Sequence, residues 1–90
     1  MKTNLKKQMK ISVDISMYPL AETFKKPILA FIHALQANPK IVVRRNTMST
    51  QIFGEFDVLM PLLNSNMKKA METDKSVVII LKVVNSDLQD

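Results

Sequence analysis

Apolar and polar residues alternate along the chain between residues 10 and 20. A period of two is typical of a β-strand that turns one face to a core and the other to polar surroundings. Pro19 ends the pattern, because proline has no N–H group to donate to a neighbouring strand. The core face is expected to hold Ile11, Val13, Ile15 and Met17, and the polar face Ser12, Asp14, Ser16 and Tyr18.

Residues 23–37 and 56–73 carry apolar residues at helical spacing instead. Each segment forms one apolar stripe, which is typical of a helix packed on a core. Pro27 falls in the opening turn of the first helix, where a missing N–H does little harm, and Pro39 helps to end that helix. The stripes consist of Phe24, Ile28, Phe31, Ile32 and Leu35 in the first segment, and of Leu59, Leu62, Leu63, Met67, Ala70 and Met71 in the second.

Three further strands complete the predicted elements. Residues 40–47 and 50–55 are expected to pair as an antiparallel hairpin, because the link between them is short. Gly54, the single glycine of the protein, indicates a bulge or a close approach in the second of these strands. Residues 76–84 are apolar on both faces, which predicts a strand covered on both sides.

The order of these elements, β-α-β-β-α-β, predicts an α+β ferredoxin-like sandwich. In this fold a four-stranded antiparallel sheet carries two helices on one face. The opposite face would combine Val78, Ile80 and Val84 with the polar face of the first strand. A bare surface of this mixed kind favours a partner, so we expect like subunits to associate sheet to sheet, as a dimer or a tetramer.

Ninety residues are enough for one domain. We place it at residues 10–85, between a flexible basic tail at 1–9 and a polar tail at 86–90. The formal net charge of +5 falls to about +1 (5 minus 4) when the four lysines of the first ten residues are set aside, so the basicity belongs mainly to the N-terminal tail. Such a tail can contact RNA or an anionic membrane, but a solvated tail is the ordinary interpretation.

No secretory signal is recognisable in the sequence, because no apolar segment of the required length follows the N-terminal lysines. The apolar run at residues 77–81 is far shorter than the roughly 20 residues that span a bilayer. The chain has no cysteine, and therefore no disulfide or thiolate, which fits a reducing compartment. We expect a cytoplasmic protein without a membrane span.

Catalytic chemistry has few candidates. His33 is the single histidine, and its ordinary interpretation is a partly exposed helix residue. The spacing of Asp14, Glu55 and Asp57 does not form a metal-binding cluster, and one glycine excludes a glycine-rich phosphate loop. The basic aromatic motif of an RNA-binding sheet is also absent. We therefore expect no enzyme, no metal, no cofactor and no nucleic-acid partner.

Polar groups suited to a small ligand are concentrated in residues 44–57. Ser49, Thr50 and Gln51 place two hydroxyls and an amide at the beginning of a strand, where they can orient a polar molecule. The alternative is that Ser49 and Thr50 are ordinary hairpin residues that cap the backbone. The residues alone leave both interpretations open.

Asp14 is a carboxylate in the middle of a strand, on a face that should be covered. A covered carboxylate needs a cationic or hydrogen-bonding partner. One explanation is a salt bridge to Arg44, Arg45 or Lys82. The other is a ligand that carries an amino group or a positive charge.

Three segments together resemble the YkoF-related thiamine-binding proteins, small ferredoxin-like domains tied to uptake or salvage of thiamine and its hydroxymethylpyrimidine precursor. Residues 11–20 (ISVDISMYPL) are similar to the opening strand of that family, which ends in a Tyr-Pro step. Residues 48–57 (MSTQIFGEFD) are similar to its hydroxyl-bearing strand, followed by glycine and the second helix. Residues 77–84 (VVIILKVV) match its closing strand, so the likeness covers about residues 10–84.

The resemblance implies a non-catalytic protein that binds thiamine or its pyrimidine half. At the matching positions, Ser49 and Thr50 would form hydrogen bonds with the pyrimidine, with Gln51 nearby. Tyr18 and Phe53 would stack on a ring. Some relatives carry two such domains in one chain. Because this chain carries one, the pairing would be between subunits, with the pocket at their interface.

Charged residues bear on which ligand is bound. Asp14 would pair with the amino group of the ligand or with a thiazolium charge. Arg44 and Arg45 add positive charge near the expected site. Either arginine, if it points inward, would oppose a thiazolium and favour the neutral pyrimidine or a phosphorylated ligand.

The sequence shows no acid–base pair for an enzyme that acts on the same pyrimidine, which leaves two other functions in the foreground. The first is vitamin binding in uptake or salvage, which is compatible with association with a transporter. The alternative is a structural or regulatory oligomerisation module without a small-molecule ligand. Loss of ligand binding with intact assembly, in a Ser49 and Thr50 variant, would separate the two.

Overall fold

The computed structural model describes residues 8–20, 25–73 and 76–89. The predicted N-terminal tail and the predicted start of the first helix at residue 23 lie largely outside the described residues. The elements follow the predicted order. They are β1 (Lys10–Pro19), α1 (Lys25–Gln36), β2 (Val42–Arg45), β3 (Thr50–Glu55), α2 (Phe56–Thr73) and β4 (Val77–Val84).

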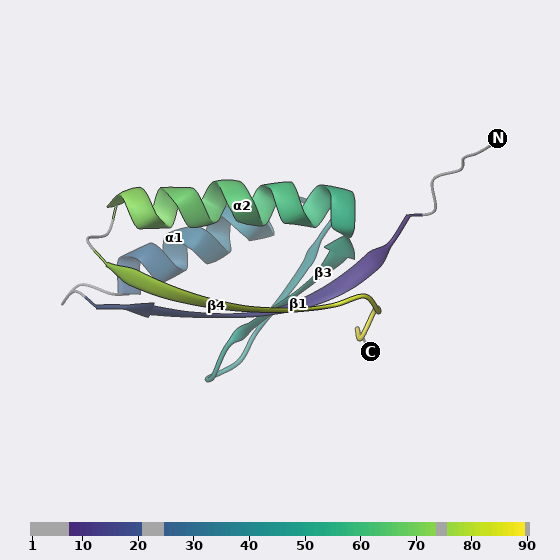
Figure 1. Cartoon of the computed structure of the whole chain (residues 1–90), viewed down its shortest axis with the longest axis horizontal. Helices are drawn as coiled ribbons and strands as arrows, with labels where there is room; N and C mark the ends of the chain where they lie inside the picture. The colour runs from purple at the N-terminus through teal and green to yellow at the C-terminus, as the bar shows by residue number, and fades with distance from the viewer. Residues whose placement is uncertain (1–7, 21–24, 74–75, 90) are drawn as a thin grey trace.

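The four strands form one sheet in the order β2-β3-β1-β4, and every neighbouring pair is antiparallel. Both helices lie on the same face of this sheet (Figure 1). The predicted α+β ferredoxin-like fold is therefore confirmed. Neither helix in the described part of the chain has the length and hydrophobicity needed to cross a membrane.

The core lies between the sheet and the two helices. The alternation along β1 explains how this strand contributes to the core, because every second residue of the strand turns toward the helices. Leu59 and Leu63, one helical turn apart on α2, are fully buried. The core cluster consists of Ile11, Val13, Ile15, Phe31, Leu35, Ile41, Ile52, Leu59 and Leu63.

The second strand is shorter than predicted. The pattern predicts a strand over residues 40–47, whereas β2 spans Val42–Arg45. Asn38 forms a turn before it, because its side-chain Oδ1 accepts a hydrogen bond from the Lys40 N–H at 2.9 Å. Its backbone oxygen accepts another from the Ile41 N–H at 3.4 Å. These bonds hold residues 38–41 out of the sheet.

Gly54 marks a close approach rather than a bulge. The pairing of β1 with β3 continues without interruption through Ile11 and Gly54. A Cβ atom at Gly54 would lie 2.9 Å from Cγ2 of Ile41, which is closer than such atoms pack. Glycine is therefore required so that Ile41 can pack into the core next to this strand.

The face of the sheet opposite the helices, here called the open face, has a broad exposed apolar surface. Val78 and Ile80 of β4 are 44% and 47% exposed, and Tyr18, which pairs with Val78, is 50% exposed. The prediction that the last strand is covered on both sides is wrong for a single chain. Helices cover one side of this edge strand, and the other side is exposed.

The segment after β4 folds back onto the open face. Figure 1 shows this C-terminal segment turning to the side of the sheet away from the helices. The Ser12 hydroxyl donates a hydrogen bond to the Ser86 carbonyl at 2.7 Å and accepts one from the Leu88 N–H at 2.8 Å. Ser12 is buried although it belongs to the predicted polar face. The polar end of the chain is thus held at the sheet over residues 86–88.

Candidate functional site

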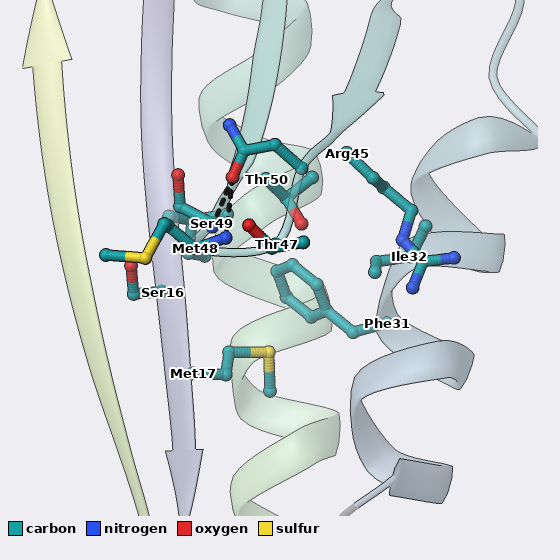
Figure 2. Close-up of a pocket in the computed structure, with 11 residues that line it drawn as sticks. Ser16, Met17, Phe31, Ile32, Arg45, Thr47, Met48, Ser49 and Thr50 are labelled. Atoms are coloured by element: carbon teal, nitrogen blue, oxygen red, sulfur yellow. Dashed lines mark hydrogen bonds between the residues drawn. The ribbon is translucent and has the colours of Figure 1, made fainter.

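The turn between β2 and β3 is fixed by one side chain. Oδ1 of Asn46 accepts hydrogen bonds from the N–H groups of Met48 and Ser49, both at 2.8 Å (Figure 2). The Asn46 N–H in turn donates to the Ser49 carbonyl at 3.0 Å. An asparagine that binds the backbone two and three residues on is a typical turn former. Asn46 therefore holds the hairpin tip in place.

The hydroxyls of Ser49 and Thr50 do not take part in this turn. Within the described part of the chain, neither hydroxyl has a hydrogen-bond partner. The capping role that the sequence offered as the ordinary explanation for these residues belongs to Asn46. Both hydroxyls thus remain available to a ligand.

A pocket of about 230 Å³ lies between this hairpin, β1 and α1, and is here called the hairpin pocket. Its floor is apolar, because Ile15, Phe31 and Ile32 are all buried core residues. Figure 2 shows Phe31 and Met17 on one side of the pocket, with Thr47 and Thr50 on the other. Small-molecule sites typically combine an apolar lining with a few convergent polar groups. The polar residues of the lining are Ser16, Arg45, Asn46, Thr47, Ser49 and Thr50.

The register of the sheet explains why Thr50 and Arg45 reach this pocket. Thr50 pairs with Ile15 of β1 and with Arg45 of β2. Residues directly opposite each other on neighbouring strands share a face of the sheet. Because Ile15 faces the helices, Thr50 and Arg45 face them as well.

The residues adjacent to Thr50, Ile15 and Arg45 in their strands point to the open face. Gln51 pairs with Asp14 and with Arg44, so these three side chains share the open face. The guanidinium carbon of Arg44 lies 5.5 Å from the centre of the Phe53 ring, a distance typical of a cation–π contact. The two adjacent arginines therefore serve different surfaces.

A second pocket, of about 290 Å³, lies on the open face and is here called the open-face pocket. Asp14, Gln51 and Phe53 line it together with Lys82, which pairs with Asp14 across β1 and β4. Leu88 of the C-terminal segment also contributes to it. This pocket thus joins a carboxylate, an amide, an amine and an aromatic ring.

Asp14 is incompletely satisfied there. Its Oδ1 atom is buried and has no hydrogen-bond partner among the residues that the structure describes. A salt bridge therefore does not satisfy this atom, although Lys82 lies opposite Asp14 in the sheet. A buried oxygen without a partner carries a desolvation cost of about 1–3 kcal/mol.

The structure divides the six predicted site residues between two faces of one sheet. Ser49 and Thr50 lie at the hairpin pocket, whereas Asp14, Gln51 and Phe53 lie at the open-face pocket. Tyr18 lines neither of these two pockets. Within the single chain, the six residues therefore do not surround one ligand.

Sequence reasoning missed Phe31 and Ile32 as pocket residues, because their place on the apolar stripe of a helix indicated a core role alone. They have both roles, since the pocket opens at the edge of the core. Asn46 was missed too, although an asparagine next to a hairpin loop is a recognisable turn signal.

Groups suited to metal binding are not found in this region. Among residues 8–20, 25–73 and 76–89, no three His, Asp or Glu side chains come close enough to hold a metal ion. His33 is an exposed residue of α1 and does not line the hairpin pocket. The hairpin pocket therefore offers hydroxyls, amide groups and one guanidinium to a ligand.

The chain is similar to known proteins in structure. No family model and no curated protein matches the chain. A solved protein of Streptococcus pneumoniae is similar to it with a TM-score of 0.79 and 24% identity, over 89% of this chain and 90% of that chain. A protein of Methanocaldococcus jannaschii has a TM-score of 0.75 and 19% identity, over 91% of this chain and 86% of its own.

A third similar structure comes from Thermotoga maritima. It is named as a candidate thiamine biosynthesis/salvage protein, with a TM-score of 0.73 and 20% identity. The match covers 89% of this chain and 84% of that chain. At these identities the likeness establishes a shared ferredoxin-like fold.

Proposed function

We propose that the protein binds thiamine or its hydroxymethylpyrimidine half in the hairpin pocket, without catalysis, as part of vitamin uptake or salvage. One observation carries this proposal. Ser49 and Thr50, the residues that the sequence resemblance assigns to the pyrimidine, lie together at a pocket with an apolar floor and have unused hydroxyls. The name of the Thermotoga structure supports the choice of ligand.

A pyrimidine ring suits this combination of groups. A hydroxyl both donates and accepts hydrogen bonds, so Ser49 and Thr50 can serve the ring nitrogens as well as the exocyclic amino group. The ring faces would lie against Phe31 and Ile32, which are already buried and need no further ordering. The tip residue Met48 is 83% exposed and leaves the pocket open on one side. A second subunit could close that side, as an interface pocket requires.

The resemblance to the YkoF-related proteins in particular stays a prediction, because none of the three structures described above is named as one of them. The proposal depends instead on the pocket and its hydroxyls. It is therefore open to a direct binding test.

The test is calorimetric titration of the purified protein with hydroxymethylpyrimidine and, in a parallel run, with thiamine. We expect saturable binding of at least one ligand. The Ser49→Ala, Thr50→Ala double variant should lose about 2 kcal/mol of binding free energy, or about 30-fold in Kd, because two hydrogen bonds of about 1 kcal/mol are removed. Ser65→Ala, an exposed serine of α2, is the matched control and should bind as the wild type does.

A second candidate function follows from the open face. Its exposed residues Tyr18, Val78 and Ile80 form an apolar surface, as expected of an oligomerisation module. Sedimentation of the same variants separates the two functions. A binding protein loses ligand affinity in the double variant and keeps its assembly. An oligomer that shows no heat with either ligand favours the structural function, and turnover of a bound ligand would contradict a non-catalytic protein.

A further inference from the structure

We propose that the hairpin pocket selects the phosphomonoester of the hydroxymethylpyrimidine over cationic thiamine, and that Arg45 binds the phosphate. This inference rests on the proposed function, since it names the ligand class of the same pocket. Three features of the pocket carry it: its charge, the availability of the arginine and its size.

The charge of the pocket is positive. Among the described residues that line it, Arg45 is charged and no carboxylate is present. Asp14, the acidic residue nearest to the pocket along β1, lies on the opposite face and lines the open-face pocket. A thiazolium in the hairpin pocket would therefore meet a like charge without a compensating carboxylate. A phosphate would meet an opposite charge and several hydroxyl donors.

The Arg45 side chain is available to a ligand. Figure 2 shows it reaching from β2 toward α1, beside Ile32. It is exposed, and within the described residues it has no ion pair or hydrogen bond of its side chain. A guanidinium with free donors matches the oxygens of a phosphate in a bidentate fashion. Arg44, in contrast, lies on the open face over the Phe53 ring.

The hairpin pocket is small and open on one side. Its volume of about 230 Å³ lies below the about 300–1,000 Å³ that is typical of sites for drug-sized ligands. Thiamine has two linked rings, whereas the hydroxymethylpyrimidine has one. A phosphate on the hydroxymethyl group of the single ring could extend toward the open rim, where Arg45 and Thr47 lie.

The experiment compares three ligands on three proteins. Hydroxymethylpyrimidine, its phosphomonoester and thiamine are titrated into the wild type, Arg45→Gln and Arg44→Gln. We expect the wild type to bind the phosphomonoester about 10- to 100-fold more tightly than the unphosphorylated pyrimidine, as a charge-assisted bidentate contact predicts. Arg45→Gln should lose this preference and keep its affinity for the unphosphorylated pyrimidine.

Arg44→Gln is the matched control, because it removes the same charge from the adjacent residue on the other face of the sheet. It should keep the preference for the phosphomonoester. If both variants lose this preference equally, the net charge of the protein and not Arg45 causes the preference. That result would overturn the inference. Inorganic phosphate serves as a competitor, and the preference should weaken at high salt.

The outcomes separate this inference from the function on which it rests. Binding of the unphosphorylated pyrimidine with no gain from the phosphate overturns the role of Arg45 and leaves vitamin binding intact. Tighter binding of thiamine than of the phosphomonoester also overturns the role of Arg45 and leaves vitamin binding intact. Absence of binding for all three ligands, from a folded protein, overturns the proposed function itself.

Discussion

The two pockets of this protein share strands β1 and β3 and differ in nearly every chemical respect. The hairpin pocket has a floor of core residues, several hydroxyls and the positive charge of Arg45. The open-face pocket has the carboxylate of Asp14, an amine and an aromatic ring, and is bordered by the C-terminal segment. Residues next to each other in a strand lie on opposite faces: Thr50 lines the hairpin pocket and Gln51 the open-face pocket. Arg45 and Arg44 are divided between the two faces in the same way.

This difference shows what a period of two does to a binding site. Residues that are adjacent in a strand are separated by the thickness of the sheet. Polar residues that are clustered in the sequence of a strand are therefore distributed over the two faces of the sheet. One ligand within a single chain therefore does not reach all six predicted residues.

The largest expected effect comes from the floor of the hairpin pocket. Phe31→Ala should lower the free energy of unfolding by about 3–5 kcal/mol, because a buried aromatic side chain is removed from the core. Urea denaturation followed by circular dichroism measures it. His33→Ala, an exposed position of the same helix, is the control and should change stability by less than about 0.5 kcal/mol. A loss of under about 1 kcal/mol for Phe31→Ala would contradict a shared floor and core.

A smaller effect is expected on the open face, at the C-terminal segment. Ser12→Ala removes a hydroxyl that forms two hydrogen bonds to this segment and should lower stability by about 1–2 kcal/mol. Hydrogen exchange of the Leu88 amide should become faster, while ligand affinity of the hairpin pocket should stay unchanged. Ser86→Ala is the control, because Ser86 contributes its backbone carbonyl to this contact. A loss of ligand affinity in Ser12→Ala would show that the two pockets are coupled.

The smallest effect concerns Asp14. Asp14→Val should raise the free energy of unfolding by about 1 kcal/mol, because the cost of a buried oxygen without a partner exceeds the modest attraction to Lys82 across the strands. Urea denaturation measures the change. Asp14→Asn, which keeps a polar group at the same position, should shift stability by less than about 0.5 kcal/mol. A clear loss of stability in Asp14→Val would indicate that a favourable interaction of the carboxylate outweighs the cost of its burial.

Much of the fold follows from the sequence because hydrophobic periodicity is a local property. The alternation along residues 10–20 predicts β1 and its core face, and the apolar stripe at 56–73 predicts α2. The exceptions have specific causes. Asn38 withdraws residues 38–41 from the second strand, and the C-terminal segment buries Ser12 on a face that the pattern marks as exposed.

The candidate site was predictable in part. Ser49 and Thr50 are predicted to bind the ligand from their polar character and a family resemblance. Both line the hairpin pocket, and their role in binding stays a prediction. Phe31 was assigned to the core alone, because its spacing gives no sign that the core ends in a pocket beside it. The separation of Asp14, Gln51 and Phe53 from this pocket follows from the pairing register, which links segments distant in the sequence.

By itself, the sequence determined the elements of this protein, their order and the core face of its first strand, because each depends on residues close together in the chain. It also excluded disulfide and thiolate chemistry, since the chain has no cysteine. The tertiary structure alone decided that Arg45 faces the hairpin pocket and Arg44 the open face. Their sides depend on the pairing of β2 with β3 and on which face the helices cover, and both result from contacts across the whole domain.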